Sequence, residues 1–132
     1  MQVYEFRRTA VERDMDLVRE ILLSIEKNPQ MDGTREFFIS RPEEMGITGC
    51  SLDELSYHLG LLIEAGFVDG ATTIVNPVVR KSTWKGHEFI ANIENDDIWS
   101  KTKKRIAGLP SVGLSVVAAI AEAEIKKHLG LT

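Results

Sequence analysis

One stretch, SLDELSYHLGLLIEAGFVDG (residues 51–70), constrains the fold most because it marks both ends of one helix. Ser51 and Glu54 have the spacing of a capping box, in which each side chain accepts a backbone N–H of the first turn. Gly66 suits the left-handed residue that follows a helix. The apolar residues between these ends recur at helical spacing: Leu55, Leu59, Leu62 and Ile63. The pattern predicts a one-faced helix that leads directly into a β-rich segment.

Similar signals predict the elements around this helix. An earlier helix begins near Asp14 and ends at Asn28-Pro29, and residues 35–40 (REFFIS) are typical of a strand. One helical turn fits before Gly46, and a β-hairpin follows Gly66 with its reversal at Asn76-Pro77. Three late helices are then predicted: one capped by Thr83, one that starts at Asp96 or Asp97 and ends near Gly108, and one from about Ser111 to Leu129.

The order helix, strand, helix, β-hairpin, helix predicts an α+β fold, specifically a winged-helix-like domain with additional C-terminal helices. The expected boundaries are an N-terminal extension at 1–12, with a short strand over Val3–Phe6, the winged-helix-like domain at 13–108, and a C-terminal helix at 109–132. A helix bundle that carries a hairpin has the same order of elements and stays open as an alternative.

Charge is distributed unevenly along the chain. Residues 1–70 contain 7 basic and 14 acidic side chains, whereas residues 71–108 contain 7 basic and 4 acidic ones. An anionic partner is therefore expected at the later part of the chain. The single cysteine, the lack of a signal-peptide pattern and the short apolar run at 109–121 favour a cytoplasmic protein with no membrane segment.

Two stretches carry a resemblance to known proteins. SYHLGLLIEAGFV (56–68) resembles the end of the third helix in small winged-helix repressors, and STWKGHEFI (82–90) is similar to the stretch after their wing. Together with RDMDLVREILLSIE (13–26), TWKGHEFIANIENDDIW (83–99) and the final Leu/Pro-led helix, they resemble a bacterial and prophage family known only as a domain of unknown function. The resemblance covers residues 13–130. It implies a phage-derived, winged-helix-like fold and no particular reaction or ligand.

Candidate DNA contacts lie on the third helix and the wing. Ser56, Tyr57 and His58 can hydrogen-bond to a base or phosphate, whereas the acidic side chains on the same helix would repel phosphate. Arg80, Lys81 and Lys85 flank the wing and can contact the DNA backbone, while residues 101–105 (KTKKR) are interpreted as a solvated helix face. The leading hypothesis is a DNA-associated transcription regulator that binds double-stranded DNA mainly through its wing. The alternative is a protein-interaction module, for a phage or host protein, that retains the fold and has lost DNA binding.

The residues that carry chemistry in enzymes and metal sites are scattered. His58, His87 and His128 lie far apart, and Cys50 stands in an acidic stretch that raises the pKa of its thiol. We therefore expect no catalytic residue, no metal and no cofactor. His58 is expected to bond a backbone group at the helix surface, and His87 to pack behind a tryptophan. The aromatic side chains expected in the core are Trp84, Phe89 and Trp99.

The final helix is apolar on more than one side. One stripe, expected to face the domain, contains Leu114, Val117, Ala118, Ala121, Ile125 and Leu129. A second stripe contains Val116, Ile120 and Ala123. Because one domain cannot cover both stripes, the second stripe predicts a homodimer through this helix.

Overall fold

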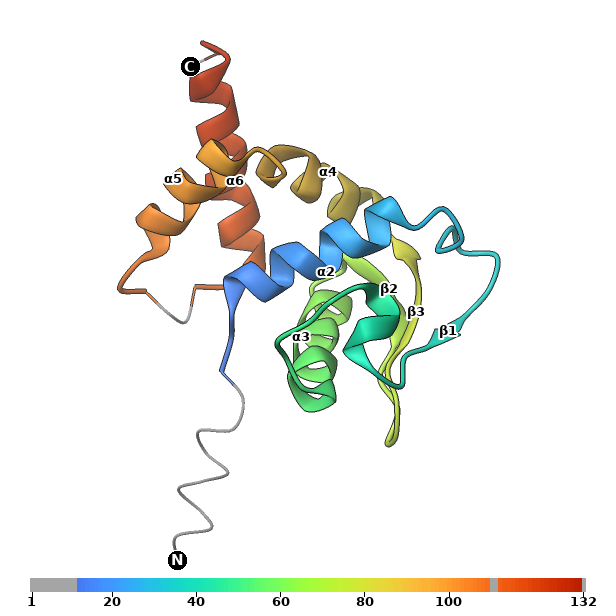
Figure 1. The fold of residues 1–132 in the computed structure, drawn as a ribbon. Helices are drawn as coiled ribbons and strands as arrows, with labels where there is room; N and C mark the ends of the chain where they lie inside the picture. Colours follow the sequence, from blue (N-terminus) through green and yellow to red (C-terminus); the bar gives the residue numbers. More distant parts are fainter. Residues whose placement is uncertain (1–11, 110–111, 132) are drawn as a thin grey trace, which may run out of the picture.

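The computed structural model describes residues 12–109 and 112–131, and over these ranges it shows an α+β fold (Figure 1). Five α-helices, one short 3-10 helix (η1) and a three-stranded antiparallel sheet follow in the order α2 (Met15–Lys27), β1 (Phe37–Phe38), η1 (Pro42–Met45), α3 (Leu52–Glu64), β2 (Val68–Ala71), β3 (Val78–Ser82), α4 (Trp84–Ile93), α5 (Asp96–Ile106) and α6 (Leu114–His128). The predicted α+β class is confirmed at this level. The short strand expected over Val3–Phe6 lies outside the described residues.

Side-chain caps start the helices where the sequence predicts them. Asp14 accepts the N–H groups of the first turn of α2. The Ser51 hydroxyl accepts the Glu54 N–H at 3.1 Å, and the Glu54 carboxylate accepts the Ser51 N–H at 2.9 Å. Thr83 caps α4 by accepting the Gly86 N–H at 3.1 Å. These bonds satisfy backbone donors that a helix start leaves without partners, so the local sequence is sufficient to place each start.

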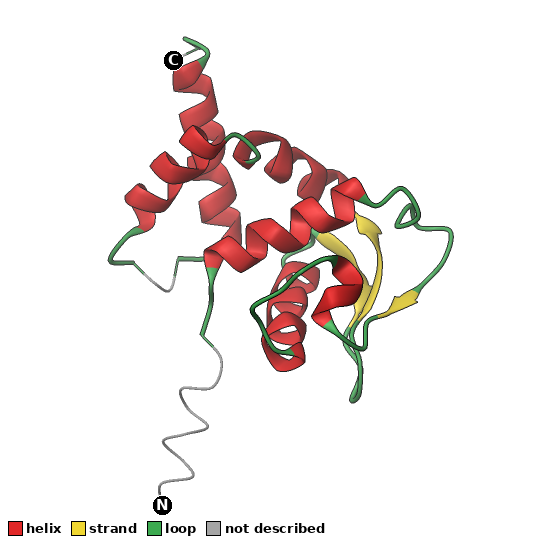
Figure 2. Ribbon diagram, in the orientation of Figure 1, coloured by secondary structure: helices red, strands yellow, loops and turns green. Residues whose placement is uncertain are grey.

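The sheet has the order β1-β3-β2, with both pairs antiparallel. Gly66 ends α3 with φ of 84°, which lets the chain turn at once into β2. The hairpin reversal occupies residues 72–77, as predicted, and we name it the β2–β3 turn. Only Phe37 and Phe38 of the predicted strand 35–40 belong to β1. The Ile39 N–H still donates to the Pro77 carbonyl at 3.0 Å, but Pro77 has no N–H to donate in return. Figure 2 shows the sheet at one side of the helices.

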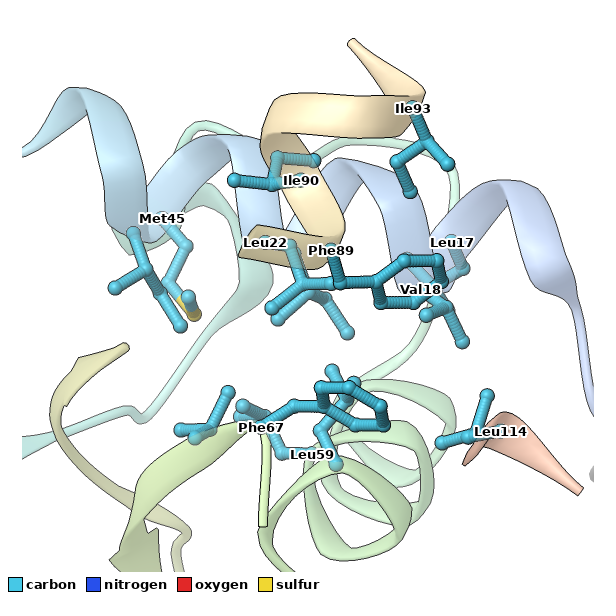
Figure 3. Close-up of a cluster of buried hydrophobic side chains, with 14 of the residues drawn as sticks. Leu17, Val18, Leu22, Met45, Leu59, Phe67, Phe89, Ile90, Ile93 and Leu114 are labelled. Atoms are coloured by element: carbon cyan, nitrogen blue, oxygen red, sulfur yellow. The ribbon is translucent and has the colours of Figure 1, made fainter. Parts of the chain in front are cut away.

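The core lies between α2, α3, α4 and one face of the sheet. Figure 3 shows Val18 and Leu22 of α2 opposite Leu59 of α3, with Phe89 of α4 between them. Phe67, at the junction of α3 and β2, packs against Phe89 with ring centroids 5.1 Å apart. The apolar stripes that predicted α2 and α3 are therefore the stripes that the fold buries.

Helix α4 approaches the chain before β2 closely. The Thr83 N–H donates to the Phe67 carbonyl at 3.1 Å, and the Thr83 hydroxyl donates to the Gly66 carbonyl at 2.6 Å. One helical turn later, Gly86 lies against the same Phe67 carbonyl, where a Cβ atom would be 2.0 Å from the oxygen. Helices α5 and α6 then pack against α4 and against each other.

One acidic side chain of α2 joins that helix to α5. The Asp16 carboxylate accepts hydrogen bonds from the Trp99 indole N–H at 2.8 Å and from the Lys103 ammonium at 2.9 Å. Burial by itself raises the pKa of Asp16, but these two donors and the positive charges nearby outweigh burial and lower the pKa below its ordinary value. The contact therefore favours the ionised carboxylate.

The two tryptophans differ in solvent exposure, and this corrects the expectation that both lie in the core. Trp99 is 3% exposed and Phe89 is 2% exposed, but Trp84 is 75% exposed. Trp84 is the first residue of α4, and five residues of helix rotate its side chain by about 140° from Phe89. A helix face that buries Phe89 thus leaves Trp84 outside.

One late helix starts as predicted and another starts later. Helix α5 begins at Asp96, and Asn95 caps it, because the Asn95 side chain accepts the N–H groups of Asp97 and Ile98. Helix α6 starts at Leu114 after Gly113, three residues later than expected.

Candidate interaction surface

Helix α3 and the β2–β3 turn together form the exposed surface at one end of the molecule (Figure 1). Helix α3 contacts β2, and the position of a Cβ on Gly60 would lie 3.5 Å from the Thr72 side chain. We call this region the α3–turn surface and define it by six residues: Asp53, Tyr57, Leu61, Glu64, Ile74 and Val75. Ser56 is half-buried beside it.

His58 is a core residue, which corrects its expected place at the helix surface and its candidacy as a DNA contact. The side chain is fully buried. Its Nδ1–H donates to the Glu54 carbonyl at 2.6 Å, and its Nε2 accepts the Asp14 N–H at 2.7 Å. Both bonds suit the neutral imidazole with its proton on Nδ1. His58 thus ties the start of α2 to α3, and it cannot reach a base or phosphate.

Tyr57 remains available on the α3–turn surface. Its side chain is 42% exposed, and its ring meets the edge of the buried His58 ring at a centroid distance of 5.2 Å. The contact holds the aromatic ring at the helix surface. Tyr57 thus presents a preorganised apolar ring with a hydroxyl at its tip.

The β2–β3 turn presents two branched apolar side chains that sequence reasoning did not select. Ile74 and Val75 are 103% and 79% exposed. The Thr73 hydroxyl accepts the N–H groups of Val75 at 3.2 Å and Asn76 at 3.0 Å. The Asn76 amide also donates to the Ser40 hydroxyl at 3.1 Å, which joins the turn to the chain after β1. The turn is thus held in one shape while its apolar side chains project into solvent.

The basic residues near the β2–β3 hairpin have partners within the molecule. Arg80 lies 3.3 Å from a Glu36 carboxylate oxygen and 3.6 Å from an Asp69 carboxylate oxygen. Lys85 donates to the Ala65 carbonyl at 3.0 Å, and its ammonium lies 4.7 Å from the centre of the Phe67 ring. Arg80 and Lys85 therefore already have partners that a DNA phosphate would have to displace.

The Lys81 side chain makes no ion pair with any residue that the structure describes, unlike that of Arg80. The side chain of Lys81 is exposed, and its methylene groups run beside Gly33, where a Cβ would lie 3.0 Å from Lys81 Cδ. One exposed lysine supplies a single phosphate contact, and several are needed for useful affinity at physiological salt.

The charged side chains of the third helix and the turn are all acidic. Residues 42–79, which include α3, β2 and the turn, contain six acidic residues and no lysine or arginine. Asp53 and Glu64 are exposed at either end of α3. Phosphate is repelled from such a surface, whereas a basic partner is attracted to it.

The candidate dimer residues of α6 differ in exposure. Val116 is 52% exposed, but Ile120 and Ala123 are half-buried, and Ile120 packs against the core. The first stripe is also only partly buried, because Leu129 is 61% exposed. The charged Glu124 is 6% exposed instead and accepts a hydrogen bond from Arg105 at 3.0 Å.

The structure gives little support for a nucleophilic cysteine or a metal site among the described residues. Burial raises the pKa of the Cys50 thiol, and Glu54 and Glu20 raise it further, so the thiol is a poor nucleophile. His87 lies beside Trp84 as predicted, with ring centroids 5.9 Å apart, but it is exposed and also bonds the Glu26 carboxylate. Among the described residues, no group of His, Cys, Asp or Glu has the geometry to hold a metal ion, and no helix is long and apolar enough to cross a membrane.

The fold and this surface define an α+β protein in which the third helix and the turn carry acidic and apolar side chains and no lysine or arginine. The chain matches the family model described as "Hypothetical protein (DUF2513)" over residues 12–112, and it therefore belongs to that family. It is also similar to an uncharacterized protein of Haemophilus influenzae, at 29% identity over 124 residues that cover 90% of this chain and 99% of the relative. No solved structure matches the chain.

Proposed function

We propose that this protein is a winged-helix-like, non-enzymatic protein-interaction module that binds its partner through the α3–turn surface. The winged-helix interpretation is supported by the order α2, β1, η1, α3, β2, β3 and by the sheet order β1-β3-β2, in which the hairpin forms the wing. The proposal assigns residues 13–108 to this domain. A phage or host protein is the partner class that the family resemblance implies.

One observation carries the proposal: the third helix and the turn, where a winged helix would meet DNA, carry no lysine or arginine to neutralise phosphate. Lysine and arginine are absent from residues 42–79, and the exposed charges of α3 are acidic. Sequence-independent affinity for DNA comes mostly from phosphate neutralisation by lysine and arginine. The third helix therefore supports protein recognition better than DNA recognition.

The exposed side chains also specify the chemistry of the partner. Tyr57, Ile74 and Val75 offer an aromatic ring and two branched apolar groups, the kinds of side chain that anchor protein interfaces. Asp53 and Glu64 add negative charge at the rim. We propose a partner that presents an apolar stripe flanked by lysine or arginine, such as a basic amphipathic helix.

The DNA-associated regulator remains a prediction with weaker support. It depends on the basic residues of the wing, and Arg80 and Lys85 are held by partners within the molecule. Of the third-helix candidates, His58 is buried and only Tyr57 is well exposed. A module that retains the fold without reading bases agrees better with these contacts.

Titration of the 15N-labelled protein with a short amphipathic helical peptide of Leu and Lys tests the proposal. We expect amide shifts concentrated at Tyr57, Leu61 and residues 73–76, with much smaller effects from the matching Leu/Glu peptide. Tyr57→Ala with Ile74→Ala should weaken binding at least tenfold, since truncated interface anchors cost roughly 2 kcal/mol or more. Trp84→Ala, which removes an exposed aromatic elsewhere, is the matched control and should bind as the parent does.

Two results would contradict the proposal. Equal binding of the Leu/Glu peptide would show that the acidic rim has no role in selection. Shifts at Tyr57 and residues 73–76 on addition of duplex DNA, lost in Arg80→Ala with Lys81→Ala, would instead support the DNA-associated regulator that binds through its wing.

We further propose that α6 pairs with the same helix of a second copy. Residues 106–121 contain no charged side chain, and Val116 and Ala119 of α6 are exposed. An uncharged face with small side chains permits close approach of two identical helices across a two-fold axis.

Val116→Glu with Ala119→Glu should convert a dimer into a folded monomer. Both side chains are exposed, so the charges leave the core intact while burying them in a dimer would be costly. Light scattering reports the mass, and an unchanged helical signal confirms folding. Ser100→Glu, on the exposed side of α5, serves as the control and should stay dimeric. If the parent is already monomeric at micromolar concentration, α6 does not pair and the dimer proposal is wrong.

A further inference from the structure

A basic hollow of about 680 Å³ lies between α5 and α6. Its lining residues are Lys101, Lys104, Arg105, Glu124, Lys127 and His128. Four of the six are lysine or arginine, in a protein whose net charge is −4. Helices α5 and α6 pack against each other, so residues more than twenty positions apart in the sequence surround one space.

Two carboxylates partly neutralise the positive charge of the hollow. Glu124 is nearly buried at its wall and pairs with Arg105 at 3.0 Å. Asp97 pairs with Lys101 at 3.3 Å from one turn earlier on α5. Lys104 and Lys127 make no ion pair with any residue that the structure describes.

Basic residues are favoured near helix C-termini, and this accounts for only part of the positive charge of the hollow. Arg105 and Lys104 lie in the last turn of α5, and Lys127 and His128 lie in the last turn of α6. Each helix C-terminus is equivalent to about half a negative charge. The two helix termini and the two carboxylates together neutralise about three of the four positive charges. About one positive charge is left, without counting His128. The hollow therefore remains attractive to an anion.

We propose that this hollow binds the phosphodiester backbone of double-stranded DNA, independently of base sequence. Lysines on two packed helices hold their charges within one region, while their flexible side chains adapt to successive phosphates. No Phe, Tyr or Trp side chain lines the hollow, so it offers no large aromatic ring on which unpaired bases could stack. Both adjoining helix ends are C-terminal, so no array of free backbone N–H groups is present to enclose a small phosphate compound.

The hollow and the α3–turn surface lie apart. In Figure 1 the end of α6 is at the top of the view, and α3 with the β2–β3 turn is at the bottom. DNA at the first site would leave the second free for a protein partner. The inference does not depend on the proposed protein interaction, and each of the two is tested by a different probe.

Fluorescence anisotropy with a labelled random-sequence duplex, at about 50 mM and about 200 mM salt, tests the proposal. The parent should bind at the lower salt and weaken steeply at the higher one. Lys104→Glu with Lys127→Glu should lower affinity at least tenfold and flatten the salt slope by about 2 units.

Two control variants distinguish binding at this hollow from a general effect of net charge and from binding at the wing. Lys27→Glu with Arg35→Glu changes the net charge equally at exposed positions on α2 and the loop before β1, and should keep most of the affinity. Arg80→Ala with Lys81→Ala should bind as the parent does. No binding by the parent at low salt, or an equal loss in the Lys27/Arg35 variant, overturns the proposal. A loss confined to the Arg80/Lys81 variant overturns it in favour of the wing.

Discussion

Gly86→Ala should prevent the protein from folding at room temperature. The added Cβ would lie 2.0 Å from the Phe67 carbonyl oxygen and 3.0 Å from its carbon, a contact with backbone that no side-chain rotation can relieve. To make room, α4 has to move away from the chain before β2, which also breaks the Thr83 bonds to Gly66 and Phe67. The cost should exceed the ~1–3 kcal/mol of ordinary overpacking. Circular dichroism and a thermal melt would show the loss of the cooperative transition.

Gly60→Ala is the matched control because it places the same methyl group in another helix. The nearest atom to the new Cβ is the Thr72 methyl at 3.5 Å, an ordinary contact. Replacing a helical glycine by alanine should then stabilise α3 by up to about 1 kcal/mol. If Gly86→Ala melts like the parent, or if both variants lose stability equally, the close packing of α4 on the Phe67 carbonyl is wrong.

Leu59→Ala should lower the free energy of unfolding by ~2–5 kcal/mol. Leu59 is fully buried in the cluster between α2, α3 and α4, and its truncation leaves a cavity that surrounding side chains fill only in part (Figure 3). Urea denaturation with an unchanged slope would measure the loss directly.

Leu61→Ala provides the comparison on the same helix. Leu61 is half-buried on the α3–turn surface, so its truncation should cost much less stability. It should instead weaken binding of the Leu/Lys peptide. Similar stability losses for Leu59→Ala and Leu61→Ala would mean that α3 does not present Leu61 to a partner.

Much of the local structure could be predicted from the sequence because helix ends depend on neighbouring residues. A Ser51 hydroxyl and a Glu54 carboxylate can satisfy each other's backbone N–H groups only at a helix start, so the capping box placed α3 correctly. Gly66 ended the same helix for an equally local reason. The start of α5 at Asp96 was also predicted, but its cap was not, because Asn95, Asp96 and Asp97 are all suitable caps in sequence and only the backbone geometry decides among them.

The candidate site was less predictable, since accessibility and charge depend on contacts between distant residues. Arg80 is a wing cation in sequence, but its partner Glu36 is 44 positions away. Tyr57 was correctly predicted to be accessible. Ile74 and Val75 were passed over because apolar residues in a β-rich run usually face a core, and only the turn geometry shows that they do not.

The sequence by itself determined where α2, α3 and α4 begin, which stripes of α2 and α3 are buried, and that a hairpin follows Gly66. These features follow from hydrogen bonds and periodicity within a few residues. Only the tertiary structure decided that Trp99 is buried while Trp84 is exposed, that His58 joins α3 to the start of α2, and that α5 and α6 gather their lysines around one hollow. The reason is physical: burial and electrostatic environment depend on which surfaces meet, and the chain brings those surfaces together from positions far apart in the sequence.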